Sequence, residues 1–257
     1  MSTTLINRYI LWKMGYFRDQ KGILNRYQNE LSNWNPHLSN TRTYIMDTVK
    51  DKSPENIAIL GSGWMLDVPI DELINISKSI TLFDIIHPSK IINKYKRYEN
   101  IKFIDVDLTG GIVEQVYKQL NINKVKRSGF VYDLHHQSID LNKFDLVISV
   151  NILNQLDILL KENIISKIEV TKEDIEFLST LIQSFHIRTL PIGKSCLISD
   201  YEELLIDKCG KQVGKNNLIF TDLPEGKNRK TWQWIFDTNQ KYYKDINVTF
   251  NVEALTF

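Results

Sequence analysis

A short glycine turn and a carboxylate follow two successive strand-like runs. The turn Gly61-Ser62-Gly63 comes directly after an apolar run, and Asp84 ends the next run. Glycines at the end of a buried strand let the backbone turn tightly and approach a ligand closely. An acid about 20 residues past such a turn is placed to hydrogen-bond a ribose diol. The pattern predicts a site for a nucleoside-containing ligand; the alternative is that both glycines only form a strand–helix turn.

The elements that must position these residues alternate along the chain. Short apolar or alternating runs predict strands at 56–60, 79–84, 101–107, 144–150 and 195–200, with a further extended piece at 130–132. Helical segments are expected between them at 67–76, 89–98, 110–121 and 152–187. This alternation is typical of a doubly wound parallel sheet.

The end of the chain has a different pattern. The strand-like runs 231–236 and 246–252 are separated by only about ten residues, which is too short for a helical crossover, so they should pair antiparallel. The predicted fold class is therefore α/β, with a mostly parallel, seven-stranded, doubly wound sheet that ends in an antiparallel pair.

Residues 1–53 have helical patterns without strands. We expect them to form an N-terminal helical extension that acts as a lid on a domain at 54–257. Trp12, Trp34 and Tyr44 are candidates to line this lid, and ordinary packing against the sheet is the alternative. Pro36 is expected to interrupt the helical pattern, with a new helix starting near Ser39.

The residues after the turn indicate which kind of nucleoside-containing ligand the site could bind. A dinucleotide fingerprint requires a third glycine, and Leu66 occupies that position. Asp67 adds a negative charge near the turn, which disfavours a phosphate and is compatible with a positive sulfonium. Asp67 is also a candidate helix N-cap, because Pro69 follows it at an early helical position.

At these positions the sequence resembles the class I S-adenosylmethionine-dependent methyltransferases. The resemblance covers about residues 54–257 and implies a Rossmann-like domain that binds S-adenosyl-L-methionine. It implies the following cofactor-binding residues: Gly61, Ser62 and Gly63 in the loop, Asp84 at the ribose, Asp107 at the adenine, and Asn151 near the reacting end. The sequence departs from the family where Met65 replaces a frequent third glycine.

Some of these residues have structural alternatives. Asp107 could cap the next helix, and Asn151 could cap the helix after the fourth strand. Asp200, after the fifth strand, is expected at the surface or as a cap. Because the glycine loop is reduced, a non-catalytic cofactor-binding protein is an alternative to a methyltransferase, and a nicotinamide-dependent oxidoreductase is less favoured.

Histidines are the candidates for a general base, because imidazole titrates near neutral pH. His37 and His87 lead, since both should lie near the mouth of the cleft, while His135 and His136 fall in an expected loop. Asn151 is the remaining catalytic candidate. No histidine has metal-ligand spacing with a second ligand, so no metal site is expected.

Composition excludes several classes of function. The net charge of +1 gives no overall attraction to nucleic acid or anionic lipid. The segment Asn151-Ile152-Leu153-Asn154 lacks the prolines typical of enzymes that methylate the amino groups of DNA bases. The two cysteines are too few for a disulfide framework, and no run approaches the length of a membrane span. We expect a cytoplasmic protein that acts on a small-molecule acceptor, with no nucleic-acid or membrane partner; the oligomeric state is open.

Overall fold

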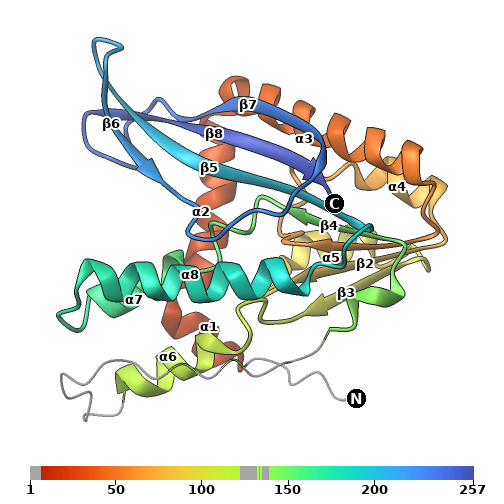
Figure 1. The fold of residues 1–257 in the computed structure, drawn as a ribbon, viewed down its shortest axis with the longest axis horizontal. Coiled ribbons are helices and arrows are strands. Elements are labelled where there is room, and N and C mark those ends of the chain that lie inside the picture. Colours follow the sequence, from red (N-terminus) through yellow and green to blue (C-terminus); the bar gives the residue numbers. More distant parts are fainter. Residues whose placement is uncertain (1–6, 122–131, 133, 135–138) are drawn as a thin grey trace.

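The computed structural model describes residues 7–121, 132, 134 and 139–257. Its strands form one sheet in the order β3-β2-β1-β4-β5-β8-β7, with β6 paired to β5 (Figure 1). Neighbouring strands from β3 to β5 are parallel, whereas β8 is antiparallel to both β5 and β7. The bounds are β1 Asn56–Leu60, β2 Ser79–Asp84, β3 Ile101–Asp105, β4 Leu146–Val150, β5 Ser195–Asp207, β6 Gln212–Asn217, β7 Lys227–Asp237 and β8 Ile246–Thr256. The predicted fold class is confirmed, and the described residues form eight strands where seven were expected.

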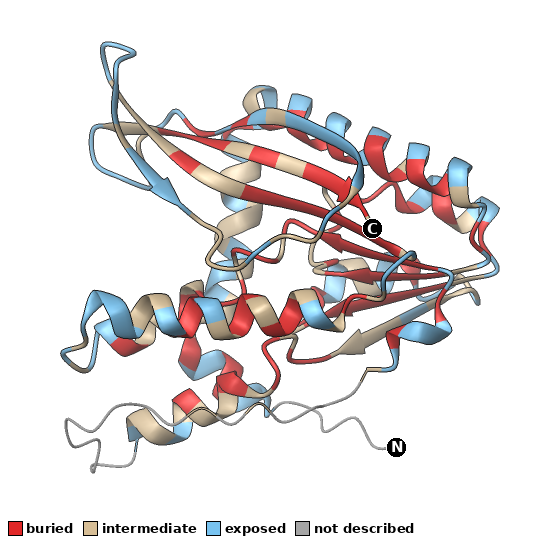
Figure 2. Ribbon diagram, in the orientation of Figure 1, coloured by how far each residue is buried: buried red, intermediate tan, exposed pale blue. Residues whose placement is uncertain are grey.

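Helices cover both faces of the sheet. They are α1 Arg8–Met14, α2 Tyr16–Asn29, α3 Leu31–Lys52, α4 Ile70–Ile76, α5 Ser89–Tyr95, α6 Ile112–Asn121, α7 Ile158–Ile165 and α8 Lys172–Thr189. In β1, Ile57 and Ile59 pack with residues of α3, α4 and α5, whereas Ala58 and Leu60 belong to a cluster on the opposite face. Burial on both faces explains why this strand reads as a continuous apolar run (Figure 2).

The helix around Pro36 corrects one prediction. Instead of breaking there, α3 begins at Leu31 and contains Pro36. The proline removes one hydrogen bond, to the carbonyl of Ser32 one turn earlier. Ser32 and Pro36 are both exposed, so water can solvate that carbonyl. The apolar face of α3 supplies Trp34, Leu38 and Ile45 to the core, and this burial outweighs the lost bond.

Two further predictions need correction. The expected helix at 152–187 is divided into α7 and α8, because Thr171 and Asp174 form a capping box that begins α8. The polar strand β6 was not predicted; its residues are mostly exposed and it has no apolar alternation. In the extended piece at 130–132 only Tyr132 is described, and His135 and His136 lie outside the described residues.

Candidate functional site

A cavity of about 300 Å³ lies at the carboxyl ends of the parallel strands. It is bounded by the turn after β1, the end of β2, the segment after β4 and Asp200 of β5. Helices α2 and α3 and the aromatic side chains of β7 and β8 complete its walls. This is the edge at which open α/β sheets bind ligands, because the connecting loops diverge there. Its volume is at the lower end of the range for small-molecule pockets.

The turn after β1 is shaped by its glycines. Gly61 has φ +81°, and a Cβ placed on it would lie 2.6 Å from Ile152 Cβ and 2.9 Å from the Val150 carbonyl oxygen. Only glycine fits there. Met65 has φ +53°, so it adopts the left-handed conformation that a third glycine would take more easily. The departure of this sequence at Met65 therefore changes the side chain but keeps the backbone conformation.

Asp84 meets this turn directly. The Gly63 backbone N–H donates to Asp84 Oδ2 at 2.8 Å, and Asp84 lines the cavity together with Gly61 and Gly63. Burial raises the pKa of the carboxyl, against the opposing effects of His87 and of the backbone N–H groups. A carboxylate has about four lone-pair sites, so Asp84 keeps capacity to accept hydrogen bonds from a ligand. The two features that the sequence placed at one sheet edge thus lie in contact.

Ser62 and His87 support the turn from behind. His87 Nδ1 lies 2.6 Å from Asp105 Oδ1, and its Nε2 lies 3.0 Å from the Ser62 hydroxyl oxygen. His87 is only 3% exposed and lies outside the cavity lining. The order Ser–His–Asp also occurs in hydrolytic triads, but Ser62 is fully buried. We interpret the linked side chains of Ser62, His87 and Asp105 as a support that holds the turn after β1.

Asp67, Asn151 and His37 meet at another side of the cavity. The Asn151 amide lies 2.6 Å from Asp67 Oδ2 and 3.2 Å from His37 Nε2. Burial raises the pKa of Asp67, while the Asn151 hydrogen bond lowers it less. The helix that follows begins at Ile70 with Pro69 as its N-cap residue, so Asp67 is not the cap that the sequence suggested. Asp67 faces the cavity instead.

The surroundings of His37 limit its chemistry. Its Nδ1 accepts a hydrogen bond from Trp232 Nε1 at 3.0 Å, and its ring stacks on Trp234 at 4.0 Å between centroids. Burial lowers the pKa of His37 to about 3, so the ring is neutral, and because Nδ1 accepts, the proton is on Nε2; the Asn151 amide nitrogen 3.2 Å away is also a donor and does not accept this proton. Nδ1, the nitrogen that could accept a proton, is therefore already occupied by Trp232. This arrangement suits an orienting residue rather than a general base.

Asp200 is the cavity residue that sequence reasoning missed. It is 1% exposed, not at the surface, and it lines the cavity where β5 leaves its parallel partner. Asn154 Nδ2 donates to its Oδ2 at 3.4 Å. Burial raises the pKa of Asp200 to about 7, nearby Asp67 adds to the rise, and Asn154 opposes it. Its position directly after a buried strand was the available signal.

Asp107 serves the local fold. Its carboxylate accepts hydrogen bonds from the Thr109 backbone N–H at 2.8 Å and from the Val113 backbone N–H at 3.3 Å. These contacts hold the loop and the first turn of α6. Asp107 lies outside the cavity lining, so the geometry favours the capping alternative over a contact with adenine.

The three aromatic residues expected in the lid differ in position. Trp34 lines the cavity. Trp12 is 61% exposed on α1, and the Tyr44 hydroxyl donates to the Asn228 carbonyl, away from the cavity. The helix that contributes most of this wall is α2, through Tyr16, Asp19, Gln20, Ile23 and Arg26.

The cavity is strongly acidic. Among the described residues that line it, five carry a carboxyl group and one carries a guanidinium: Asp19, Asp67, Asp84, Glu162, Asp200 and Arg26. Since His37 is neutral, it adds no positive charge. The lining therefore favours ligands with a positive charge and disfavours phosphates.

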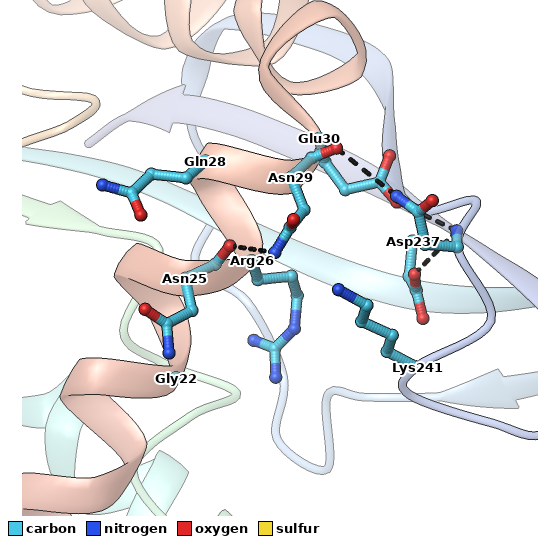
Figure 3. A pocket seen from close by; sticks show the side chains of 9 residues that line it. Gly22, Asn25, Arg26, Gln28, Asn29, Glu30, Asp237 and Lys241 are labelled. Carbon is cyan, nitrogen blue, oxygen red and sulfur yellow. Dashed lines mark hydrogen bonds between the residues drawn. The ribbon is translucent and has the colours of Figure 1, made fainter.

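A second cavity, of about 380 Å³, shares Arg26 with the first. Figure 3 shows the side chains that line this second cavity. Here Glu30, between α2 and α3, accepts hydrogen bonds from Asn33, Thr238 and Asn239. Burial alone would raise the pKa of Glu30, but these hydrogen bonds outweigh it and the pKa is lowered. Every oxygen is satisfied, which is typical of a structural link between the helices and the loop after β7.

The described residues contain neither a cluster of metal ligands nor a candidate membrane span. They contain no group of three or more His, Cys, Asp or Glu side chains that could hold a metal ion. No helix in the part of the chain that the structure describes has the length and apolar character needed to cross a membrane.

No protein-family model matches the chain, and no curated protein matches it in sequence. Among solved structures, it is similar to the N-methyltransferase NodS from Bradyrhizobium japonicum WM9, with 13% identity, a TM-score of 0.40, and coverage of 85% of this chain and 96% of that one. It is also similar to the plantazolicin methyltransferase BpumL in complex with SAH, with 10% identity, a TM-score of 0.36, and coverage of 97% and 100%. A DhpI–SAH complex gives 10% identity, a TM-score of 0.36, and coverage of 100% and 99%.

These TM-scores are too low for function to be inferred from them. The strand order of this chain is informative by itself. Five parallel strands with β1 at their centre are followed by a strand inserted antiparallel between β5 and the edge. The antiparallel pairing of β7 and β8 is the one that the sequence predicted. By the order and direction of its strands, the chain has an α/β fold with a doubly wound, mostly parallel sheet that ends in antiparallel strands.

Proposed function

We propose that this protein is an S-adenosylmethionine-dependent methyltransferase that acts on a small-molecule acceptor in the cavity at the sheet edge. The observation that carries the proposal is the contact between Gly63 N and Asp84 Oδ2 at 2.8 Å, at the wall of that cavity. It brings a glycine turn and a carboxylate with spare acceptor capacity to the place where a ribose diol and an amino-acid moiety could bind together.

The residues present fit this cofactor. Asp84 would accept from the ribose hydroxyls, and the turn at 61–63 would admit the methionine moiety. The excess of carboxyl groups around the cavity suits a ligand with net positive charge. S-adenosylmethionine supplies an electrophilic methyl group on a positive sulfur. The chain's own contribution would be to orient the acceptor and to exclude water.

The acidic lining also separates this proposal from the nicotinamide alternative. A dinucleotide would bring a pyrophosphate close to Asp67 and Asp84, and like charges in a buried site are unfavourable. A fluorescence titration with reduced nicotinamide dinucleotide should therefore show no saturable binding. Saturable binding of that dinucleotide, without binding of S-adenosylmethionine, would favour an oxidoreductase.

Calorimetric titration with S-adenosylmethionine tests the proposal. We expect binding to the unmodified protein and an affinity loss of about tenfold or more in Asp84→Asn, because an amide presents fewer acceptors to the diol. Asp51→Asn is the matched control, since Asp51 is exposed at the end of α3. Absence of heat with the unmodified protein, or equal affinity in Asp84→Asn, would contradict the proposal.

Turnover distinguishes a methyltransferase from a non-catalytic cofactor-binding protein. Release of S-adenosylhomocysteine is measured over a panel of small amines, alcohols, thiols and carboxylic acids. Release with one class supports the enzyme. Tight cofactor binding without release in any class favours the accessory role.

A further inference from the structure

Two buried oxygen atoms on one side of the cavity have no hydrogen-bond donor. Asn154 Oδ1 and Asp200 Oδ1 accept no hydrogen bond from any residue in the described ranges. The two residues are 7% and 1% exposed, and both line the cavity. Their mutual contact of 3.4 Å, through Asn154 Nδ2 and Asp200 Oδ2, uses neither oxygen. A buried acceptor without a donor is costly, so this pair favours a ligand that brings donors.

The other walls of the cavity are aromatic and favour a different part of the ligand than the two unsatisfied oxygens do. Aromatic side chains of α3, β7, β8 and the loop after β7 line the same cavity: Trp34, Trp234, Phe236, Tyr242 and Phe250. Their faces pack against carbon chains and attract cations within about 6 Å of a ring centroid. The ligand should therefore combine a positively charged group that donates hydrogen bonds with a short apolar body.

Common methyl acceptors differ in how well they meet these conditions. An aliphatic ammonium group carries three donors and a positive charge. An alcohol has a single donor and no charge, a thiol is a weak donor, and a carboxylate has none and would face the carboxyl groups of the lining. Of these classes, the amine alone matches both Asp200 and the aromatic walls.

We propose that the methyl acceptor is a small aliphatic amine, with its nitrogen against Asp200 and Asn154 and its carbon chain against the aromatic walls. This inference rests on the proposed function, since it names the acceptor of that same cavity. It assigns to Asp200 two roles, binding the amine and accepting its proton.

Methyl transfer requires the amine in its neutral form, because only then does nitrogen have a free lone pair. The ammonium form gives one proton to the Asp200 carboxylate and becomes a neutral amine. The nitrogen lone pair then forms a bond to the methyl carbon, the carbon–sulfur bond breaks, and its electron pair stays on sulfur. The products are a methylammonium ion and a neutral thioether, and the proton leaves Asp200 for solvent. Burial raises the pKa of Asp200 to about 7, which suits it to take up and release a proton near neutral pH.

Binding of n-alkylamines from methylamine to n-hexylamine tests the proposal, with the n-alcohols of equal length as matched probes. Calorimetry uses the full chain saturated with S-adenosylhomocysteine, so no turnover occurs. We expect at least one amine to bind about tenfold or more tightly than its matched alcohol. Asp200→Asn should lose about tenfold or more of that amine affinity, Asn154→Ala should lose less, and the exposed control Asp51→Asn should lose none.

Three results would overturn the proposal. One is an alcohol series that binds as tightly as the amines, and another is full amine affinity in Asp200→Asn. The third is a parallel loss of S-adenosylhomocysteine affinity in Asp200→Asn, which would assign Asp200 to the amino group of the cofactor. A thermal melt of Asp200→Asn checks that this variant is folded.

Failure of this inference is distinguishable from failure of the proposed function. If the unmodified protein binds S-adenosylhomocysteine but no amine of the series, the acceptor class is wrong and the methyltransferase proposal is unaffected. If it binds no cofactor, the proposed function fails, and amine titration of the protein without cofactor then decides whether Asp200 binds an amine.

Discussion

Glu30 and Asp200 are both buried acids, and they line two neighbouring cavities, yet their surroundings are opposite. Glu30 accepts hydrogen bonds from the backbone N–H groups of Thr238 and Asn239, at 2.8 and 3.0 Å, and from the Asn33 amide. Among the described residues, the Asp200 carboxylate has a single hydrogen-bond partner, Asn154 at 3.4 Å, and one of its oxygens has no donor. A satisfied acid stabilises the fold, whereas an unsatisfied one is a place for a ligand.

The difference reverses the dependence of stability on pH. The pKa of Glu30 is lowered from 4.5, so its contribution to stability is present above that pH and is lost as the pH falls through the folded value. The pKa of Asp200 is raised from 3.8 to about 7. Between those values the folded state holds a proton that the unfolded state releases, so the free energy of unfolding decreases as the pH rises.

The largest effect is expected for Glu30→Ala. It removes the charged acceptor of the N–H groups of Thr238 and Asn239, and a hydrogen bond to a charged group contributes about 1.5–3 kcal/mol. We expect the free energy of unfolding at pH 7 to decrease by about 3 kcal/mol, measured from urea unfolding.

Glu30→Gln is the matched control, because its carbonyl oxygen can replace only one of the two carboxylate oxygens. It should lose about half as much, and the difference from the unmodified protein should shrink below pH 4.5. If the Glu30→Ala variant were as stable as the unmodified protein, Glu30 would not have the stabilising role that distinguishes it from Asp200.

An intermediate effect, in the stabilising direction, is expected for Asp200→Asn at pH 8. The rise of the Asp200 pKa to about 7 corresponds to at most about 4 kcal/mol of destabilisation when the group is ionised. A buried amide without full hydrogen bonding offsets part of this gain, so we expect about 2 kcal/mol of net stabilisation. Thermal melts from pH 4 to 8 should show the gain growing with pH. A variant less stable than the unmodified protein at pH 8 would contradict the ionised, unsatisfied state of Asp200.

The smallest effect is expected for Asp107→Ala, which extends the comparison to an acid engaged in capping. Loss of the contacts with Thr109 and Val113 should reduce the free energy of unfolding by about 1 kcal/mol. Affinity for S-adenosylmethionine, measured by calorimetry, should stay unchanged. A large loss of that affinity would indicate that Asp107 binds the cofactor, as the resemblance implied.

Local sequence patterns predicted the strands correctly where a strand is buried on both faces of the sheet. Strands covered on both faces, such as β1 and β4, read as unbroken apolar runs, and the short gap before β8 required an antiparallel pair. Patterns failed where tertiary contacts override local preference. Pro36 remains inside α3 because the rest of that helix is held by the core, and β6 exists because β5 extends beyond the sheet and offers it an edge.

The same distinction applies to the site. Gly61, Gly63 and Asp84 could be predicted because each follows a strand at the same edge, so sequence spacing fixes their proximity. That Asp67 and Asp200 share one cavity could not be predicted, since they are 133 positions apart and each has an ordinary structural alternative at the surface or at a helix end. Their shared cavity depends on α2, α3 and the antiparallel strands closing over the sheet.

The sequence by itself determined the parallel sheet, its antiparallel end and the turn that faces Asp84, because strand burial and connection length are local properties. Only the tertiary structure decided which acids would be satisfied and which would remain in need of a ligand. Hydrogen-bond satisfaction depends on donors that arrive from distant elements: Thr238 and Asn239 reach Glu30, while none of the described residues reaches the second oxygen of Asp200.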